Sequence, residues 1–210
     1  MLISVLIPTY NRQNTITRAI RSILDQTISK LNYEIIVIDD GSTDDTCSVL
    51  SPFLKDINLI SLPSNVGLPA ALNEGIKQSH GQFIVRLDSD DYVLSAYLEI
   101  LSLALRLNNS IDAVACDYQL VDMRENVIKT VNCMEEPIAC GIMYRTQQIH
   151  EIGLFNPSFR LFEDREFRRR FLRQYSYTRL PIPLYKYLMH DTNLSKNQQM
   201  ISYYTALLEE

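Results

Sequence analysis

The sequence predicts a single-domain α/β protein with a Rossmann-like, mostly parallel mixed sheet flanked by helices. The first observation is that short apolar runs alternate with stretches in which apolar residues recur at helical spacing. The second is that these runs end in proline or aspartate, as strands do at turns. Such alternation is typical of parallel strands joined by right-handed helical crossovers. The 210 residues, 46% hydrophobic and 21% charged, fit one globular domain.

The first half of the chain contains four predicted strand–helix pairs. The strands are expected at residues 3–7, 35–38, 57–62 and 83–87. The helices are expected at residues 14–25, 44–54, 68–76 and 94–105. Ser42 or Thr43 is expected to cap the second helix, and Gly81 is expected to follow the third helix as a C′ glycine.

After residue 110 the alternation becomes weaker. Strands are expected at 112–116 and 127–131, a charged helix at 164–174, an extended segment at 177–188 and a final helix at 197–208. No internal repeat, low-complexity segment or linker is visible in the sequence. We therefore expect one domain over residues 1–210.

Composition excludes several classes of protein. The net charge of −5 argues against nucleic acid as a partner, and no apolar run has the length needed to span a bilayer. Residues 1–7 lack the basic region of a signal peptide and are interpreted as the first strand. The four cysteines include no C-x-x-C pair, which favours a reduced, cytoplasmic protein. Contact with the inner face of the membrane remains an open alternative.

Three carboxylates, Asp88, Asp90 and Asp91, follow the strand at 83–87. Their mutual repulsion must be offset by a metal ion, a basic side chain or water. An Asp-x-Asp spacing at a strand end suits Mg²⁺ or Mn²⁺, because hard cations prefer oxygen ligands. The alternative is a solvated acidic turn, in which Asp91 caps the next helix or supports the cluster.

Two further turns lie at the carboxyl ends of predicted strands, one at Pro8-Thr9-Tyr10 and one at Asp39-Asp40. In open α/β sheets ligands bind beyond these ends, so both turns and the Asp88 cluster should meet in one crevice. There is neither a G-x-G-x-x-G nor a P-loop sequence to hold phosphates. A metal ion held by carboxylates can bridge a diphosphate instead. Asp39 can accept a hydrogen bond from a base, and Tyr10 can stack on it.

Five sequence blocks, in order, resemble glycosyltransferase family 2. They are Val5-Leu6-Ile7-Pro8-Thr9-Tyr10-Asn11-Arg12, Val37-Ile38-Asp39-Asp40-Gly41-Ser42-Thr43-Asp44, Asn65-x-Gly67 with Ala71-Leu72-Asn73-Glu74-Gly75-Ile76, Arg86-Leu87-Asp88-Ser89-Asp90-Asp91, and Phe162-Glu163-Asp164-Arg165-Glu166-Phe167. With the late His190 segment they cover nearly the whole chain.

The resemblance implies a GT-A fold and a metal-dependent, inverting glycosyltransferase. Its donor would be a nucleotide-diphosphate sugar, with UDP-sugar favoured, and its cofactor Mn²⁺ or Mg²⁺. The acceptor hydroxyl would belong to a saccharide or a lipid-linked saccharide in cell-envelope polysaccharide or glycan assembly. Residues 1–110 would bind the donor, and residues 111–210 would bind the acceptor and supply the base.

The resemblance also implies roles for individual residues. Asp164 would be the general base, with Glu163 as support, and Asp90 and His190 would bind the metal. The donor would be contacted by Pro8, Thr9, Tyr10, Asp39, Asn65, Arg86, Asp88 and Ser89. One departure concerns Leu72, which stands where many members have a nucleotide-binding arginine; Arg86 is a candidate to replace that charge. For His190 the alternative is a side chain that is only hydrogen bonded.

Two alternatives to a glycosyltransferase are weighed. A nucleotidyltransferase should carry a glycine-rich loop with basic residues after its first strand, and Pro8-Thr9-Tyr10-Asn11-Arg12 offers none. A non-catalytic sugar-binding module need not retain Asp88, Asp90 and Asp164 together. A run of arginines is either a solvated helix face or a contact with an anionic, lipid-linked acceptor or membrane surface. Its members are Arg165, Arg168, Arg169, Arg170 and Arg173.

Overall fold

The first four strands form one parallel block of a larger sheet. The computed structural model describes residues 2–189, 203–205 and 207–208. Strands β1 (Ile3–Thr9), β2 (Tyr33–Asp39), β3 (Asn58–Ser61) and β4 (Phe83–Arg86) lie in the order β3-β2-β1-β4. All seven residues of β1 are buried, as expected for a central strand covered on both faces.

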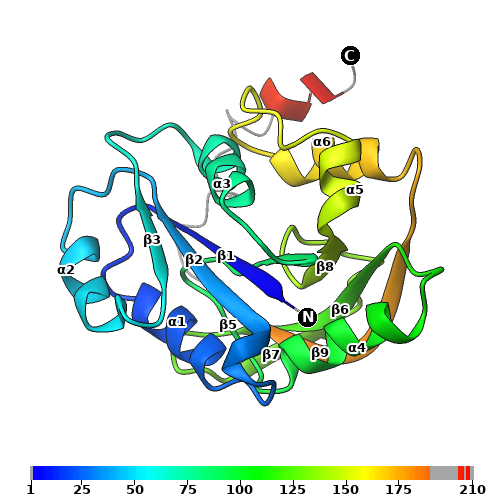
Figure 1. Ribbon diagram of the computed structural model, residues 1–210, viewed down its shortest axis with the longest axis horizontal. Coiled ribbons are helices and arrows are strands. Elements are labelled where there is room, and N and C mark those ends of the chain that lie inside the picture. Colours follow the sequence, from blue (N-terminus) through cyan, green and yellow to red (C-terminus); the bar gives the residue numbers. More distant parts are fainter. Residues whose placement is uncertain (1, 190–202, 206, 209–210) are drawn as a thin grey trace.

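Helices cover both faces of this sheet. In Figure 1, α3 (Leu68–Lys77), α5 (Thr146–Glu151) and α6 (Glu163–Phe171) lie above the strands, whereas α1 (Ile16–Leu24) and α4 (Tyr97–Leu107) lie below them. The short helix α2 (Thr46–Leu50) follows the turn after β2. Two 3₁₀ turns lie at Lys30–Asn32 and Ser51–Phe53. None of these helices is long and apolar enough to cross a membrane.

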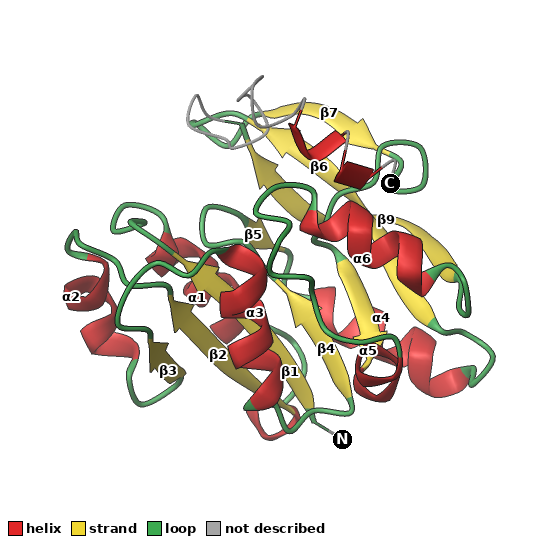
Figure 2. Cartoon of the chain, turned by 90° about the horizontal axis from the view of Figure 1, so that it is seen from above, coloured by secondary structure: helices red, strands yellow, loops and turns green. Residues whose placement is uncertain are grey.

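The second half of the chain extends the same sheet beyond β4. Strand β8 (Ile142–Arg145) pairs antiparallel with both β4 and β6 (Ala113–Val121). Strand β9 (Tyr177–Leu188) runs parallel to β6. Strand β5 (Tyr92–Val93) pairs antiparallel with β9, and β7 (Val127–Val131) pairs antiparallel with β6. Figure 2 shows β6, β9 and α6 together beyond β4. The α/β class and the mixed, mostly parallel sheet are therefore confirmed.

Several local predictions are wrong for identifiable reasons. Helix α2 begins at Thr46 with Asp45 at its N-cap, and Ser42 instead accepts a hydrogen bond from the Asn11 backbone N–H at 2.9 Å. Helix α3 ends at Lys77, so Gly81 does not cap it. A Cβ at Gly81 would lie 2.5 Å from the Ser4 backbone nitrogen, so this glycine allows the close approach of two backbones instead.

The elements that were not predicted are short and depend on distant partners. Strand β5 has two residues and pairs with β9, which follows more than 80 positions later. Strand β8 and helix α5 lie in the region where the alternation is weak. The predicted final helix at 197–208 falls largely outside the described residues.

The sheet topology determines where a ligand can bind. Because β1, β2 and β4 are parallel neighbours, their carboxyl ends meet at one edge. The turns after these three strands contain most of the residues that the sequence singled out.

Candidate active site

The turn after β2 holds the Asp39 carboxylate in one orientation. Asp39 is the last residue of β2 and is only 2% exposed. Its Oδ1 accepts a hydrogen bond from the Ser42 backbone N–H at 3.2 Å, and its Oδ2 accepts one from the Cys47 thiol at 3.0 Å. One donor lies in the turn after β2 and the other in the first turn of α2, so the carboxylate is positioned before any ligand arrives.

Asp40 fastens the neighbouring loop to this turn. Its carboxylate accepts hydrogen bonds from the backbone N–H groups of Val66 at 2.8 Å and Gly67 at 3.0 Å. Gly41 has a φ of +71°, and a Cβ there would lie 2.9 Å from the Asn65 backbone nitrogen. The exposed Asn65 therefore stands directly beside the end of β2.

The predicted nucleoside residues of β1 lie at the same edge. Thr9 pairs in register with Asp39, and Pro8 precedes it in the buried strand. Tyr10, just beyond the strand, is 41% exposed. The buried Thr9 hydroxyl has no hydrogen-bond partner within the part of the chain that the structure describes. The structure thus brings together Pro8, Thr9, Tyr10, Asp39 and Asn65.

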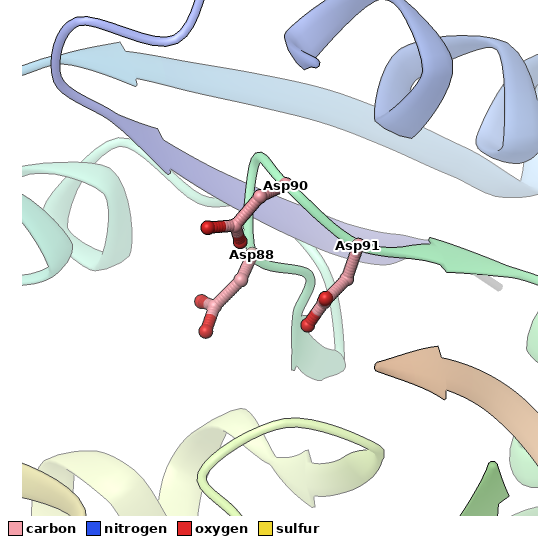
Figure 3. Close-up of side chains that lie close together, drawn as sticks. All are labelled: Asp88, Asp90 and Asp91. Atoms are coloured by element: carbon pink, nitrogen blue, oxygen red, sulfur yellow. The ribbon is translucent and has the colours of Figure 1, made fainter. Parts of the chain in front are cut away.

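The turn after β4 gathers the three carboxylates (Figure 3). Ligand oxygens of Asp88, Asp90 and Asp91 all lie within 4.8 Å of one another. Ser89, between the first two, is buried. The set is of the type that holds a hard divalent cation. Each carboxylate has a different environment, which suggests different roles.

Asp88 is held by Arg86. The guanidinium donates from Nε to Asp88 Oδ1 at 2.6 Å and from Nη2 to Oδ2 at 3.1 Å. Its Nη1 donates to Glu163 Oε1 at 2.9 Å. The side chain of Arg86 is 11% exposed. Burial opposes its charged form, but the carboxylates of Asp88 and Glu163 raise the Arg86 pKa well above its usual value.

Asp91 is the buried member of the cluster. Its carboxylate accepts hydrogen bonds from the Tyr185 hydroxyl at 2.6 Å and from the Leu188 backbone N–H at 2.8 Å. Burial, followed by the charges of Asp88 and Asp90, raises its pKa well above the usual range. Helix α4 begins only at Tyr97, so Asp91 is not its cap. Asp91 instead ties the acidic turn to the end of β9.

Two arginines contact Asp90. Its Oδ2 lies 3.5 Å from Nε of Arg12, and its side chain is 19% exposed. Arg18 on α1 donates to its backbone carbonyl at 2.7 Å. Two arginines therefore offset part of the negative charge at this turn, as the sequence argument required.

Asp164 lies in the wall of a separate cavity of about 550 Å³. It is the second residue of α6, directly after the buried Glu163. Burial raises the Glu163 pKa, while the nearby Arg86 guanidinium opposes that rise. The Arg86–Glu163 contact fastens the first residue of α6 to the acidic turn. The predicted base is thereby linked to the predicted metal site.

The described structure adds three residues that sequence reasoning missed: Arg12, Arg18 and Tyr185. Arg12 stands in the predicted turn after β1, so its position was a usable signal. Arg18 lies within α1, and Tyr185 follows Asp91 by 94 positions. No local sequence pattern therefore indicated that either residue reaches the acidic turn. Leu72, the departure from the family pattern, is buried in the core. His190 lies outside the described residues, and the roles of the other site residues remain predictions.

Removal of the Arg86 charge should strongly destabilise the protein. Arg86→Met leaves the buried Glu163 without its partner, and we expect the free energy of unfolding to fall by about 3 kcal/mol. Urea denaturation measures the change. Lys77→Met is the control, because Lys77 pairs with Glu74 on the surface, where such pairs contribute about 0.5 kcal/mol. Equal losses in both variants would contradict the buried role of Arg86.

The exposed Cys47 should react unusually slowly with iodoacetamide. Its hydrogen bond to Asp39, with partial burial and nearby negative charge, raises the pKa of the thiol to about 11. At pH 8 about one thiol in a thousand is then ionised. Asp39→Asn removes the charge, so we expect alkylation to become roughly tenfold faster.

Mass spectrometry of the folded protein measures this rate, because Cys116, Cys133 and Cys140 are buried. Asp45→Asn changes an exposed acid of the same turn and should leave the rate unchanged. An identical rate in the Asp39 and Asp45 variants would disprove the coupling.

Comparison with known proteins gives a consistent result. Residues 4–173 match the family model described as Glycosyl transferase family 2. An uncharacterized glycosyltransferase of Haemophilus influenzae is 36% identical over 133 residues, which are 62% of this chain and 52% of that protein. The poly(ribitol-phosphate) beta-N-acetylglucosaminyltransferase TarS of Staphylococcus aureus is 38% identical over 96 residues, 44% of this chain and 17% of TarS. The chain spans between about a quarter and a half of the first relatives that it matches.

Solved structures share the fold. TarS residues 1–349 in complex with UDP-GlcNAc superpose with a TM-score of 0.79 at 25% identity, over 94% of this chain and 61% of that one. The mannosyltransferase PcManGT of Pyrobaculum calidifontis, in complex with GDP-Man and Mn²⁺, superposes with a TM-score of 0.75 at 16% identity. That match covers 99% of this chain and 64% of PcManGT. The predicted GT-A fold is confirmed. Since the family model covers most of its length, the chain belongs to glycosyl transferase family 2.

Proposed function

We propose that this chain transfers a sugar from a nucleotide-diphosphate donor to an acceptor hydroxyl. The observation that carries the proposal is the single edge at which the Asp39 turn and the acidic turn meet, with Asp164 linked to it through Arg86 and Glu163. A nucleoside site, a cation site and a base are the three parts that such a transfer needs. Family membership supports the same reaction.

UDP-sugar is the donor that we favour. Asp39 can accept the N–H of a pyrimidine base, because Ser42 and Cys47 donate only one hydrogen bond to each of its oxygens. The unpartnered Thr9 hydroxyl, at the same register, offers a further polar contact. The likeness to TarS in complex with UDP-GlcNAc supports this choice, and the TarS description supports a role in cell-envelope glycan assembly.

Mn²⁺ or Mg²⁺ is the proposed cofactor, with Asp90 as its direct ligand. The three carboxylates fit a hard cation, and Asp90 is the second acid of the Asp-x-Asp spacing, the position that the family resemblance assigns to the metal. Asp88, held by Arg86, would face the ribose and diphosphate. Once bound, the cation would stabilise the charge on the leaving diphosphate. The Mn²⁺ complex of PcManGT supports the assignment.

Asp164 would take the proton of the acceptor hydroxyl. Glu163 and Arg86 hold the start of α6 in place, so the carboxylate is oriented toward the cavity by residues that do not themselves react. The hydroxyl would attack the face of the anomeric carbon opposite the diphosphate, which inverts the configuration. The departing diphosphate needs no second acid, since it leaves as a stable anion.

Metal dependence can be tested by calorimetric titration with UDP, GDP and CDP, each with and without Mn²⁺. We expect UDP to bind most tightly and Mn²⁺ to increase its affinity by about tenfold or more, which corresponds to about 1.4 kcal/mol. Asp90→Asn should abolish the increase. Asp45→Asn, which changes an acid outside the cluster, should preserve it. If UDP binds equally well without metal, the cation site is rejected.

The role of Asp164 can be tested separately. Asp164→Asn should retain UDP binding, because Asp164 lines the 550 Å³ cavity and not the proposed nucleoside site at Asp39. We expect the rate of sugar transfer to fall by about 10²-fold or more. Glu135→Gln, which changes another acid that lines that cavity, is the control and should alter the rate much less. Turnover of the Asp164 variant at the wild-type rate would remove Asp164 as the base.

A further inference from the structure

We propose that the acceptor carries a phosphate ester close to its reacting hydroxyl, and that Arg165 and Arg168 bind this phosphate. The inference rests on the proposed function, because it takes Asp164 as the base and the cavity beside it as the acceptor site. The sequence allowed two interpretations of the arginine run, a solvated helix face or a contact with an anionic ligand. The structure shows that the five arginines have different contacts.

Three of the five arginines are directed elsewhere. Arg170 pairs with Glu166 at 2.6 Å and donates to the carbonyl oxygens of Ile152, Gly153 and Leu154. Arg169 donates to the carbonyl oxygen of Leu208, and Arg173 is exposed beyond the end of α6. Only Arg165 and Arg168 line the 550 Å³ cavity together with Asp164.

Within the residues that the structure describes, neither Arg165 nor Arg168 forms an ion pair, and both line the cavity. Their guanidinium groups lie over aromatic rings, Arg165 at 4.0 Å from the centroid of Phe162 and Arg168 at 5.0 Å from that of Tyr177. Stacking holds a guanidinium plane in place and leaves its N–H edge available, which is the geometry that recognises phosphate.

The acids of the cavity do not cancel this charge. Glu135 and Glu136 also line it, but both side chains are exposed and therefore screened by water. Glu136 already pairs with Lys129, and Glu135 accepts a hydrogen bond from Asn132 at 2.7 Å. Asp164, the third acid, is reserved for the hydroxyl. The α6 side of the cavity thus presents one carboxylate and two cations.

The spacing of these groups limits the acceptor. Asp164 and Arg168 are four residues apart on one helix face, and such positions lie about 6 Å apart. A hydroxyl at Asp164 and a phosphate at Arg168 must therefore be separated by only a few bonds. The aromatic wall formed by Tyr118, Tyr144 and Phe155 suits the carbon face of a polyol or sugar. The cavity volume is also typical of a small-molecule site.

The inference can be tested by calorimetry on the full chain with UDP and Mn²⁺ present. The probes are ribitol 5-phosphate, ribitol and inorganic phosphate. We expect ribitol 5-phosphate to bind at least tenfold more tightly than ribitol, and inorganic phosphate to compete with it. Arg165→Gln and Arg168→Gln should each weaken ribitol 5-phosphate binding by about tenfold, as expected for a lost charge-assisted hydrogen bond. Arg173→Gln, the matched control from the same run, should not.

A parallel assay separates the two sources of phosphate. The protein is sedimented with phosphatidylglycerol vesicles. If Arg165→Gln and Arg168→Gln both abolish co-sedimentation, the phosphate belongs to a lipid headgroup. If neither substitution changes co-sedimentation, the phosphate belongs to a soluble or polymeric acceptor. Equal binding of ribitol and ribitol 5-phosphate, or equal weakening by Arg173→Gln, would overturn the inference. UDP titration of every variant keeps the outcomes distinct: if UDP binds but no phosphate does, only the acceptor inference fails. If UDP does not bind the wild-type protein, the proposed function fails.

Discussion

The ion pairs of Arg86 connect the two parts of the candidate site. This buried guanidinium contacts Asp88 on one side and Glu163 on the other, across 77 positions of sequence. One carboxylate belongs to the turn after β4 and the other to the first turn of α6. A buried charge with a single partner would be costly, and two partners make the arrangement stable. This one side chain therefore links the start of α6, where Asp164 lies, to the acidic turn.

The acidic turn illustrates how a protein tolerates like charges in close proximity. Asp88 is neutralised by a bidentate arginine, and Asp91 is buried with a tyrosine hydroxyl and a backbone N–H as donors. Asp90 lies 3.5 Å from Nε of Arg12. The charges of Arg86 and Arg12 and the donors to Asp91 together offset the repulsion among the three carboxylates.

The second half of the chain contributes through elements that the sequence patterns describe poorly. Strand β8 enters the sheet antiparallel between β4 and β6 and supplies Tyr144, which packs against Phe167 and Phe171 of α6. This aromatic packing positions α6 over the sheet. Among the charged residues of α6, Arg170 pairs with Glu166, whereas Arg165 and Arg168 line the cavity. The arginines that are adjacent in the sequence are thereby directed to different contacts in space.

The sequence alone determined the βαβ alternation, the turns after β1, β2 and β4, and the family blocks, because buried strands and tight turns have local residue requirements. Asp39, Asp88 and Asp90 were recognisable since each follows an apolar run. Only the tertiary structure decided the partners of these residues. Arg18, Tyr185 and Glu163 reach the acidic turn from segments whose separation along the chain gives no local signal. Antiparallel insertion of β8 and the division of the arginine run likewise follow from packing, which depends on contacts between distant residues.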